Sequence, residues 1–300
     1  MNTYSRFKSV IIKLHFSLTS LYSRIVTKGY YWWFINLAKS NVETGINPVS
    51  ENNIIVSFTT LSHRAKYCLP TIQSLLTQTI KPNKIILWIT ESEKTCFNNL
   101  QKKQLRKLMK LKKAGLEILK TSDIGPLTKF LPAKELFPNA LIVTADDDII
   151  YPKRWLQDLY ESYLKEPNCI HCYRAHNMLF NKNGALKQYN SWGFESKGIQ
   201  GPSLDLFPTG VYGVLYAPQH LDENVLDKEK YKMLSYKNDD VWLKAMSLKK
   251  GVLCKKVRKN TKRFFELNFS EKAPLNQTNV HSSNNDIYIK TVWSHYFNLK

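Results

Sequence analysis

The feature that most constrains this 300-residue chain is an apolar run over 140–145 that ends in three consecutive aspartates, Asp146, Asp147 and Asp148. The run is short, continuous and rich in β-branched residues, which predicts a buried parallel strand. A buried carboxylate is costly and adjacent carboxylates repel each other. A strand that ends in three of them therefore needs a cation or a cluster of hydrogen-bond donors nearby.

Ligands bind at the carboxyl ends of strands in open α/β sheets, and hard divalent cations prefer carboxylate oxygens together with phosphate oxygens. The aspartates therefore predict a site for a metal-bound phosphate ester. The alternative is an acidic start to the next helix, expected over 152–164, since the helix dipole favours carboxylates there. That alternative accounts for one or two of the three carboxylates.

Strands and helices alternate along the chain from residue 54. The expected order up to the aspartates is strand 54–60, helix 65–77, strand 84–90, helix 97–113, strand 116–119, helix 126–136 and strand 141–145. This order predicts an α/β fold with a mostly parallel, doubly wound sheet flanked by helices. Further on, shorter strands are expected over 170–174, 186–189, 211–217 and 252–257, with one clear helix over 239–248.

The chain is strongly basic, with 44 Lys and Arg against 24 Asp and Glu, a formal net charge of +20 and a pI of about 9.6. Such a field favours polyanionic partners, namely nucleic acid, anionic lipid headgroups or phosphorylated substrates. Basic residues concentrate over 102–113 and 249–263. A helix with one solvated face accounts for much of the first run.

Residues 1–40 contain no acidic residue, and they interleave Lys and Arg with apolar side chains up to an aromatic block at 30–35. A basic amphipathic segment rich in aromatics is typical of a helix that lies in a membrane interface. The alternative is a helix docked on the protein's own core or on another subunit. Residues 41–53 are expected to form a linker. The sequence has neither an apolar run of about 18 residues nor a recognisable secretory signal.

Five cysteines are spread through the chain, an odd number that argues against a disulfide framework. Cys169 and Cys172 have the spacing of half a zinc or redox site, but no second pair follows them, so packing in the core is their expected role. We expect the chain to be in a reducing compartment.

Residues 57–64 follow the first strand and lack the glycine-rich loop of dinucleotide-binding folds and P-loop enzymes. Thr59 and Arg64 in this stretch are candidates to hold a base, a ribose or a phosphate. The alternative is that the stretch simply caps the next helix through Ser62.

Two further stretches combine glycine with polar residues. After the third strand, Asp123 is a candidate to accept from a uracil or ribose, and Lys129 to neutralise a diphosphate; an ordinary turn before a Pro-started helix is the alternative. Gly210 and Gly213 flank an aromatic residue and would let backbone approach a ligand closely, unless they only form a strand bulge.

The last constellation is an acidic pair, Asp239 and Asp240, at the start of the helix expected over 239–248. One of the two carboxylates could act as a general base. The alternative is that Asp239 caps the helix.

In this order, the elements closely resemble the GT-A (Rossmann-like) fold of nucleotide-sugar-dependent glycosyltransferases, specifically the family 2-like branch. The resemblance covers about residues 53–265. Its parts are Thr59-Thr60 with Arg64, the Gly-Pro-x-x-Lys element at 125–129, the aspartates with Tyr151-Pro152, the Gly-x-x-Gly-x-Leu-Tyr-x-Pro stretch at 210–218, and the acidic pair before Val241-Trp242-Leu243.

The resemblance implies a role for each of these residues. Asp146 to Asp148 would be the Asp-x-Asp motif, in which Asp148 binds Mn²⁺ or Mg²⁺ and Asp146 contacts the metal's water or the ribose. The donor pocket would be formed by Thr59, Arg64, Asp123, Gly125, Lys129, Asp146, Asp147, Gly210 and Gly213. Asp240, or else Asp239, would deprotonate the acceptor hydroxyl in an inverting displacement.

Two departures refine what the resemblance implies. The chain lacks the Gln-x-x-Arg-Trp signature and the transmembrane bundle of processive synthases, which indicates transfer of a single sugar. Gly-Pro-x-x-Lys stands where many relatives have an Ala-Arg-Asn stretch. The implied reaction moves one sugar from a UDP-sugar to a glycan or lipid-linked acceptor in surface polysaccharide synthesis, in the cytoplasm or peripherally on the inner face of the cell membrane.

The expected organisation is an amphipathic segment 1–40, a linker 41–53, a catalytic domain 54–268 and a C-terminal tail 269–300. One alternative function is a metal-dependent nucleotidyltransferase, but its usual glycine-rich basic loop is missing after the first strand. A basic nucleic-acid-binding protein is the other. No helix-turn-helix, zinc or aromatic nucleic-acid motif is present, so no nucleic-acid partner is expected.

Overall fold

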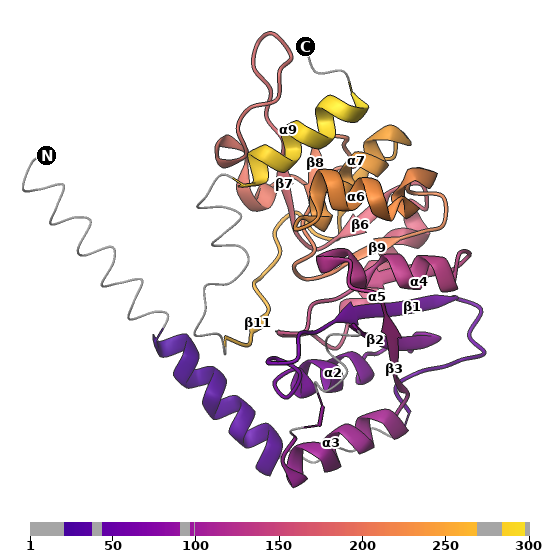
Figure 1. Ribbon diagram of the computed structural model, residues 1–300, viewed down its shortest axis with the longest axis vertical. Coiled ribbons are helices and arrows are strands. Elements are labelled where there is room, and N and C mark those ends of the chain that lie inside the picture. Colours follow the sequence, from indigo (N-terminus) through magenta and orange to yellow (C-terminus); the bar gives the residue numbers. More distant parts are fainter. Residues whose placement is uncertain (1–20, 38–43, 91–96, 99, 269–283, 298–300) are drawn as a thin grey trace, which may run out of the picture.

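The computed structural model describes residues 21–37, 44–90, 97–98, 100–268 and 284–297. A seven-stranded sheet in the order β10-β6-β9-β4-β1-β2-β3 forms its centre (Figure 1). The strands are β1 (Ile54–Thr59), β2 (Lys84–Thr90), β3 (Leu116–Thr121), β4 (Leu141–Thr144), β6 (Ile170–Cys172), β9 (Val214–Tyr216) and β10 (Cys254–Lys256). Only β9 runs antiparallel to its neighbours, so the predicted α/β fold with a mostly parallel sheet is confirmed.

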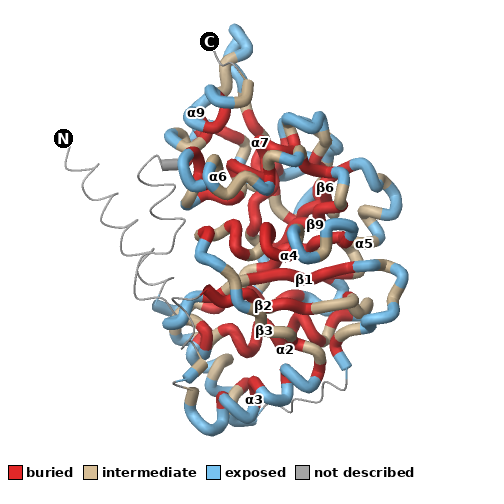
Figure 2. Tube along the Cα trace, turned by 45° about the vertical axis from the view of Figure 1, so that its right-hand side comes forward, coloured by how far each residue is buried: buried red, intermediate tan, exposed pale blue. Residues whose placement is uncertain are grey.

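Helices cover both faces of this sheet. They are α2 (Leu69–Leu76), α3 (Lys102–Lys113), α4 (Leu131–Leu136), α5 (Trp155–Lys165), α6 (Lys228–Ser235), α7 (Asp239–Lys249) and α9 (Asn284–Tyr296). Successive residues of a strand point to opposite faces. Accordingly, Ile55 packs in the core with α4, α7 and α9, whereas Ile54 and Val56 pack with α2, α3 and α5. Burial on both faces explains the continuous apolar runs. Figure 2 shows β1 and β2 buried and α3 largely exposed.

Two small sheets lie beside the central one. In the first, β5 (Ile149–Ile150), which directly follows the aspartates, pairs with β11 (Phe265–Glu266). The N–H of Leu267 donates to the carbonyl of Asp148 over 2.6 Å. We call residues 261–268 the closing segment, because they run along the edge of the aspartate turn. In the second, β7 (Ala175–Asn177) pairs with β8 (Leu206–Pro208).

The helix over 21–36 contacts the body through one face. Phe34 is buried against the core, and Tyr31 Oη donates to the carbonyl of Lys66 over 2.5 Å. Thr27 is buried too, and its Oγ1 accepts from the N–H of Asn268 over 3.1 Å. The opposite face leaves large apolar side chains exposed, namely Leu21, Tyr22, Ile25, Trp32 and Trp33. Residues 1–20 and 38–40 of the expected amphipathic segment lie outside the described residues.

Several elements differ from expectation at their ends. The helix expected over 97–113 begins at Lys102, because Gln101 forms a capping box with Gln104. The helix expected over 126–136 divides into η2 (Gly125–Lys129) and α4. Residues 186–189 form no strand, and 189–191 form a 3₁₀ turn instead. Helix α6 and strands β7 and β8 were not predicted, since short polar helices and three-residue strands leave little periodic signal.

The described cysteines are Cys68, Cys169, Cys172 and Cys254, and all four are buried thiols without a disulfide. Cys169 and Cys172 accordingly pack in the core around β6. Cys96 lies outside the described residues.

Candidate active site

The aspartates turn away from the end of β4 in a conformation fixed by an aromatic residue. The N–H of Asp146 donates to Tyr151 Oη over 2.8 Å. Tyr151 is buried, and its ring lies 4.4 Å from that of Trp155. The turn is therefore anchored to α5, which explains why Tyr151-Pro152 accompanies the aspartates.

Asp147 and Asp148 are held by side chains that follow β1. Thr60 Oγ1 donates to Asp147 Oδ2 over 2.5 Å, and Arg64 Nη2 lies 2.5 Å from Asp147 Oδ1 and 2.6 Å from Asp148 Oδ2. Burial, the largest cause, raises the pKa of both carboxyls above the usual value, although the Arg64 guanidinium opposes the rise. The Asp147 side chain exposes 10% of its surface and that of Asp148 39%. Asp147 is therefore an internal anchor, and Asp148 is the carboxylate open to a ligand.

Lys129 connects the aspartates to the acidic pair on α7. Its Nζ lies 3.1 Å from Asp146 Oδ1 and 3.2 Å from Asp239 Oδ2. Burial alone would lower the pKa of Lys129, but attraction from the surrounding carboxylates outweighs burial and holds this pKa well above its usual value. The ammonium group therefore stays charged at the centre of the site.

The backbone of Lys129 is held by the first two strands. Ser57 Oγ on β1 donates to the carbonyl of Lys129 over 2.6 Å, and Trp88 Nε1 on β2 donates to the same Ser57 Oγ over 2.8 Å. These bonds place η2 at the carboxyl end of the sheet, next to the aspartates.

The acidic pair opens α7, but the cap of this helix is Asn238. Asn238 Oδ1 accepts from the N–H of Val241 over 3.0 Å, and its Nδ2 donates to Asn285 Oδ1 on α9 over 2.7 Å. Neither carboxylate is thus occupied in capping. Asp240 Oδ1 instead accepts from the N–H of Gly210 over 2.8 Å.

Burial first, and then repulsion from Asp239, raise the pKa of Asp240 to about 7, against the attraction of Lys129. The carboxyl thus exchanges its proton near neutral pH. Asp239 Oδ2 is buried without a hydrogen bond, so its ion pair with Lys129 provides its polar contact.

The two glycines of the third motif have different surroundings. A Cβ at Gly210 would lie 2.7 Å from Lys129 Nζ and 3.3 Å from Asp240 Oδ1, so a side chain there would displace the Lys129 ammonium group. Gly213 has a φ of +96°, and a Cβ there would lie 2.6 Å from the Trp155 ring. Gly210 therefore borders the charged centre, whereas Gly213 packs on α5.

Three other predicted residues make contacts outside this charged centre. Thr59 Oγ1 donates to the carbonyl of Trp88 over 3.0 Å. Asp123 is exposed after β3, and its Oδ1 accepts from the N–H of Gly125 over 2.8 Å. Within the described residues, no hydrogen bond or ion pair joins Asp123 to the aspartates. Gly125 has a φ of +60° and lies against the carbonyl of Tyr236.

The structure also assigns contacts to residues for which no individual role is predicted above. Thr60 and Tyr151 belong to the motifs, and their side chains bond Asp147 and the backbone of Asp146, alongside Arg64 and Lys129. Ser57 positions Lys129, and Asn238 caps α7. The polar Ser57 inside an apolar strand and the Asn before an acidic pair were the available signals.

The donor set fits a divalent cation shared with a phosphate. Five carboxylates, Asp146, Asp147, Asp148, Asp239 and Asp240, are in contact with two cationic side chains, Arg64 and Lys129, and the N–H of Gly210. In the described part of the chain, no three His, Cys, Asp or Glu side chains converge to hold a metal by themselves. Mg²⁺ commonly uses one or two carboxylates together with substrate phosphates and water. Asp148, with Asp146, could hold a metal in that way.

No family model and no curated protein matches the chain. Among solved structures, it is similar to TarS residues 1–349 of S. aureus, with a TM-score of 0.43 and 12% identity over 70% of this chain and 59% of that one. It is also similar to the mannosyltransferase PcManGT from Pyrobaculum calidifontis in complex with GDP-Man and Mn²⁺, with a TM-score of 0.33 and 14% identity over 54% of this chain and 46% of that one. The chain therefore spans about half the length of these structures. Both similarities concern the arrangement of the backbone, and the roles of individual residues rest on the contacts described above.

Proposed function

We propose that the chain is a glycosyltransferase that moves one sugar from a nucleotide diphosphate sugar, a UDP-sugar, to a hydroxyl of a glycan or lipid-linked acceptor. The observation that carries this proposal is that two groups of aspartates lie around Lys129. One group follows β4 and suits a metal-bound diphosphate. The other opens α7 and includes Asp240, a carboxyl with a pKa of about 7.

On the donor side, Asp148 and Asp146 would hold Mn²⁺ or Mg²⁺, which would supply a Lewis acid for the charge of the leaving diphosphate. Arg64 and Lys129 supply fixed positive charge in the same region. Asp147 keeps Arg64 beside Asp148. Lys129 would contact a diphosphate oxygen, since a buried ammonium group stabilises charge that develops in the transition state.

On the acceptor side, Asp240 would be the general base. The acceptor oxygen attacks the anomeric carbon, and the bond from that carbon to the diphosphate oxygen breaks, with its electron pair leaving on the nucleoside diphosphate. The acceptor proton moves to the Asp240 carboxylate. Attack opposite the leaving group inverts the anomeric centre. The N–H of Gly210 fixes one carboxylate oxygen of Asp240 and so orients the other.

The experiment that tests this function is a panel of nucleotide sugars, incubated with the full chain and Mn²⁺ or Mg²⁺ and a mixture of glycan acceptors. Release of nucleoside diphosphate is the expected product. Release of inorganic pyrophosphate from a nucleotide triphosphate and a sugar phosphate would instead indicate a nucleotidyltransferase. No turnover with any donor would contradict both.

We also propose that the helix over 21–36 attaches the chain peripherally to an anionic membrane surface at the inner face of the cell membrane. Its outward face carries exposed Trp32, Trp33 and Ile25, and Lys28 lies on the same side. Aromatic and basic side chains on one helix face favour the lipid interface. No helix in the described ranges is long and apolar enough to cross a membrane.

Helix α3 contributes basic and apolar side chains beside this helix. A hollow between the helix over 21–36 and α3 is lined by Ile35, Asn36, Lys103, Leu105, Arg106, Lys107, Met109 and Lys110. Leu105 and Met109 are half exposed, which extends the apolar surface among basic side chains. Basic residues near anionic lipid contribute roughly 1 kcal/mol each.

A further inference from the structure

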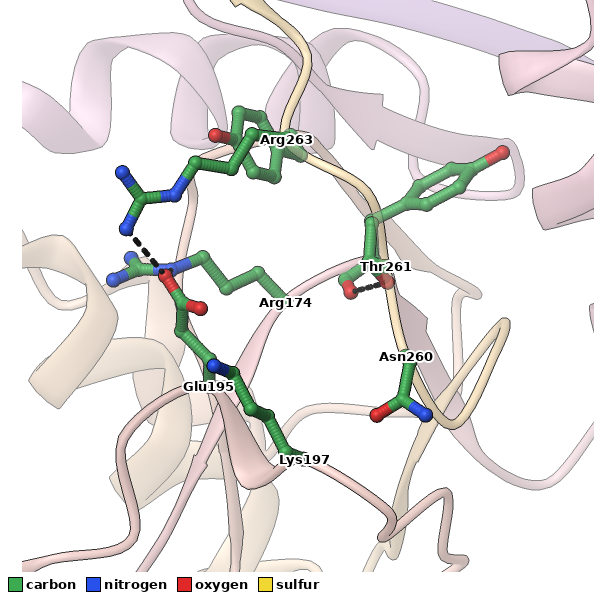
Figure 3. Close-up of a pocket in the computed structure, with 8 residues that line it drawn as sticks. Arg174, Glu195, Lys197, Asn260, Thr261 and Arg263 are labelled. Atoms are coloured by element: carbon green, nitrogen blue, oxygen red, sulfur yellow. Dashed lines mark hydrogen bonds and ion pairs between the residues drawn. The ribbon is translucent and has the colours of Figure 1, made fainter.

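A small cavity beside the proposed catalytic centre takes no part in the roles assigned so far. It has a volume of about 150 Å³ and is bordered by Arg174, Glu195, Lys197, Tyr212, Thr261 and Arg263. Figure 3 shows Arg174 and Arg263 reaching toward Glu195 on one side, with Thr261 on the other. Pockets for a whole small molecule are typically about 300–1,000 Å³. This cavity therefore suits one functional group of a larger ligand.

Three cationic side chains, Arg174, Lys197 and Arg263, and one carboxylate, that of Glu195, line this cavity. Arg263 Nη2 lies 3.5 Å and Arg174 Nε 3.7 Å from Glu195 Oε1. Both separations exceed the roughly 2.7–2.9 Å of a charge-assisted hydrogen bond. Among the described residues, Lys197 has no ion-pair partner. The cavity therefore carries an excess of positive charge. Its cationic side chains can still donate hydrogen bonds to a ligand, because Glu195 does not bind them at close distance.

The backbone around the cavity is held in an unusual conformation. Four described residues other than glycine have a positive φ; two of them, Glu195 and Tyr212, border this cavity, and a third, Ser196, lies between Glu195 and Lys197. Lys256 is buried and donates to the carbonyls of Glu195 and Ser196 over 2.9 and 2.8 Å. Left-handed backbone is costly for residues with side chains and clusters at ligand sites. The fold thus keeps the Glu195 turn in place despite its cost.

The cavity shares a turn with the candidate base. Arg174 Nη1 donates to Thr209 Oγ1 over 3.2 Å, and the N–H of Thr209 donates to the carbonyl of Arg174 over 3.1 Å. The next residue is Gly210, whose N–H donates to Asp240. Residues 209–212 therefore have Asp240 on one side and the cavity on the other. The same turn thus contacts both places, so one acceptor could present a hydroxyl at Asp240 and a second group at the cavity.

We infer that this cavity binds a phosphate group carried by the acceptor. Guanidinium groups match phosphate oxygens through paired donors, and Lys197 adds a third positive charge. This inference rests on the proposed function, because it assigns the acceptor side of that same reaction. It makes the acceptor a phosphorylated or phosphodiester-linked glycan or lipid.

Binding of glycerol 3-phosphate tests the inference directly. The full chain is titrated by calorimetry in 150 mM NaCl with glycerol 3-phosphate, with glycerate and with glycerol. We expect binding of the phosphate, weaker binding of the carboxylate and none of the neutral alcohol. The double variant Lys197→Gln with Arg263→Gln should raise the Kd for glycerol 3-phosphate by about tenfold or more, since it removes two charged contacts.

Two further variants separate the cavity from the general positive field. Lys262→Gln removes a neighbouring exposed charge that does not border the cavity, and it should leave the Kd nearly unchanged. Glu195→Gln removes the competing carboxylate and should tighten binding several-fold. An equal loss in Lys262→Gln and in the double variant would overturn the inference, as would tighter binding of glycerate than of the phosphate.

Binding of UDP with Mn²⁺ distinguishes this inference from the proposed function. The double variant should bind UDP as the unmodified chain does. If no nucleotide sugar is turned over but the phosphate titrations behave as expected, the proposed function fails and the anion site stands without it. If turnover is found and the double variant binds glycerol 3-phosphate normally, only the cavity assignment is wrong.

Discussion

Lys129 Nζ lies 3.1 Å from Asp146 Oδ1, and this ion pair joins the segment that follows β3 to the segment that follows β4. The ammonium group also pairs with Asp239, whose Oδ2 lies 3.2 Å away. Lys129 therefore neutralises carboxylates from two segments that are distant in sequence. Its removal should affect both segments.

Lys129→Met should destabilise the protein and shift its pH dependence. Removing one partner of a buried ion pair typically costs about 3 kcal/mol in the free energy of unfolding. Because Lys129 lowers the pKa of Asp240, its loss should move the midpoint of the pH–rate profile above 7. Urea unfolding at pH 7.5 and rates between pH 5 and 9 measure the two effects. Lys120→Met, an exposed lysine on β3, is the matched control and should change neither.

Asp240→Asn should retain donor binding and lose turnover. A positioned general base contributes about 10²–10⁴-fold, and the asparagine Oδ1 still accepts from Gly210. In the unmodified chain, turnover should rise with pH through about 7, because only the ionised carboxyl accepts the proton. Normal turnover in this variant and collapse in Asp239→Asn would move the base by one residue.

The same variant should be more stable than the unmodified chain at alkaline pH. The pKa of Asp240 is about 7 in the folded protein and 3.8 ordinarily. The unfolded chain therefore loses this proton first, and the free energy of unfolding falls as pH rises from about 4 to about 7. Asparagine avoids that loss. Its advantage in Tm should therefore grow between pH 4 and 7 and reach roughly 2 °C or more at pH 8. A Tm below that of the unmodified chain at pH 8 would contradict the direction of this shift.

Asp148→Ala and Asp147→Ala should have different consequences. The side chain of Asp148 is the more exposed, so its removal should abolish Mn²⁺-dependent UDP binding in calorimetry while the Tm stays close to normal. Asp147 bonds Thr60 and Arg64, so its removal should lower the Tm. Thr60→Val should lower the Tm in the same way and still bind UDP. Unchanged UDP and Mn²⁺ binding in Asp148→Ala would exclude this residue as the metal ligand.

The exposed face of the N-terminal helix should determine membrane attachment. Ile25→Ser with Trp32→Ser should reduce cosedimentation with phosphatidylglycerol vesicles and leave the Tm unchanged, since both side chains are exposed. Phe34→Ala, on the buried face, should instead destabilise the chain by about 3 kcal/mol. If the double variant stays on the vesicles, attachment must come from the basic surface around α3.

The sequence predicted the fold where the signal was long and continuous. β1, β2 and β4 are buried on both faces, so their apolar runs could be found, and the aspartates could be placed at a carboxyl edge. Lys129 and Asp146 both follow strands that end at this edge, which brings the two side chains together.

Contacts made through loops were not predictable in this way. The cap of α7 by Asn238 and the bond from Thr60 to Asp147 depend on side-chain geometry within a turn. The cavity near Glu195 combines residues from four segments of the chain, and none of these segments has a local pattern that marks it.

The closing segment has a consequence for any attempt to shorten the chain. Leu267 bonds the backbone of Asp148, and its neighbour Asn268 bonds Thr27 in the N-terminal helix. The ring of Phe265 in the same segment lies 5.2 Å from that of Tyr30. A truncated protein that starts at residue 54 would leave this segment without its outer support. It would therefore be a poor reference for donor affinity, and kinetic comparisons require the helix to be retained.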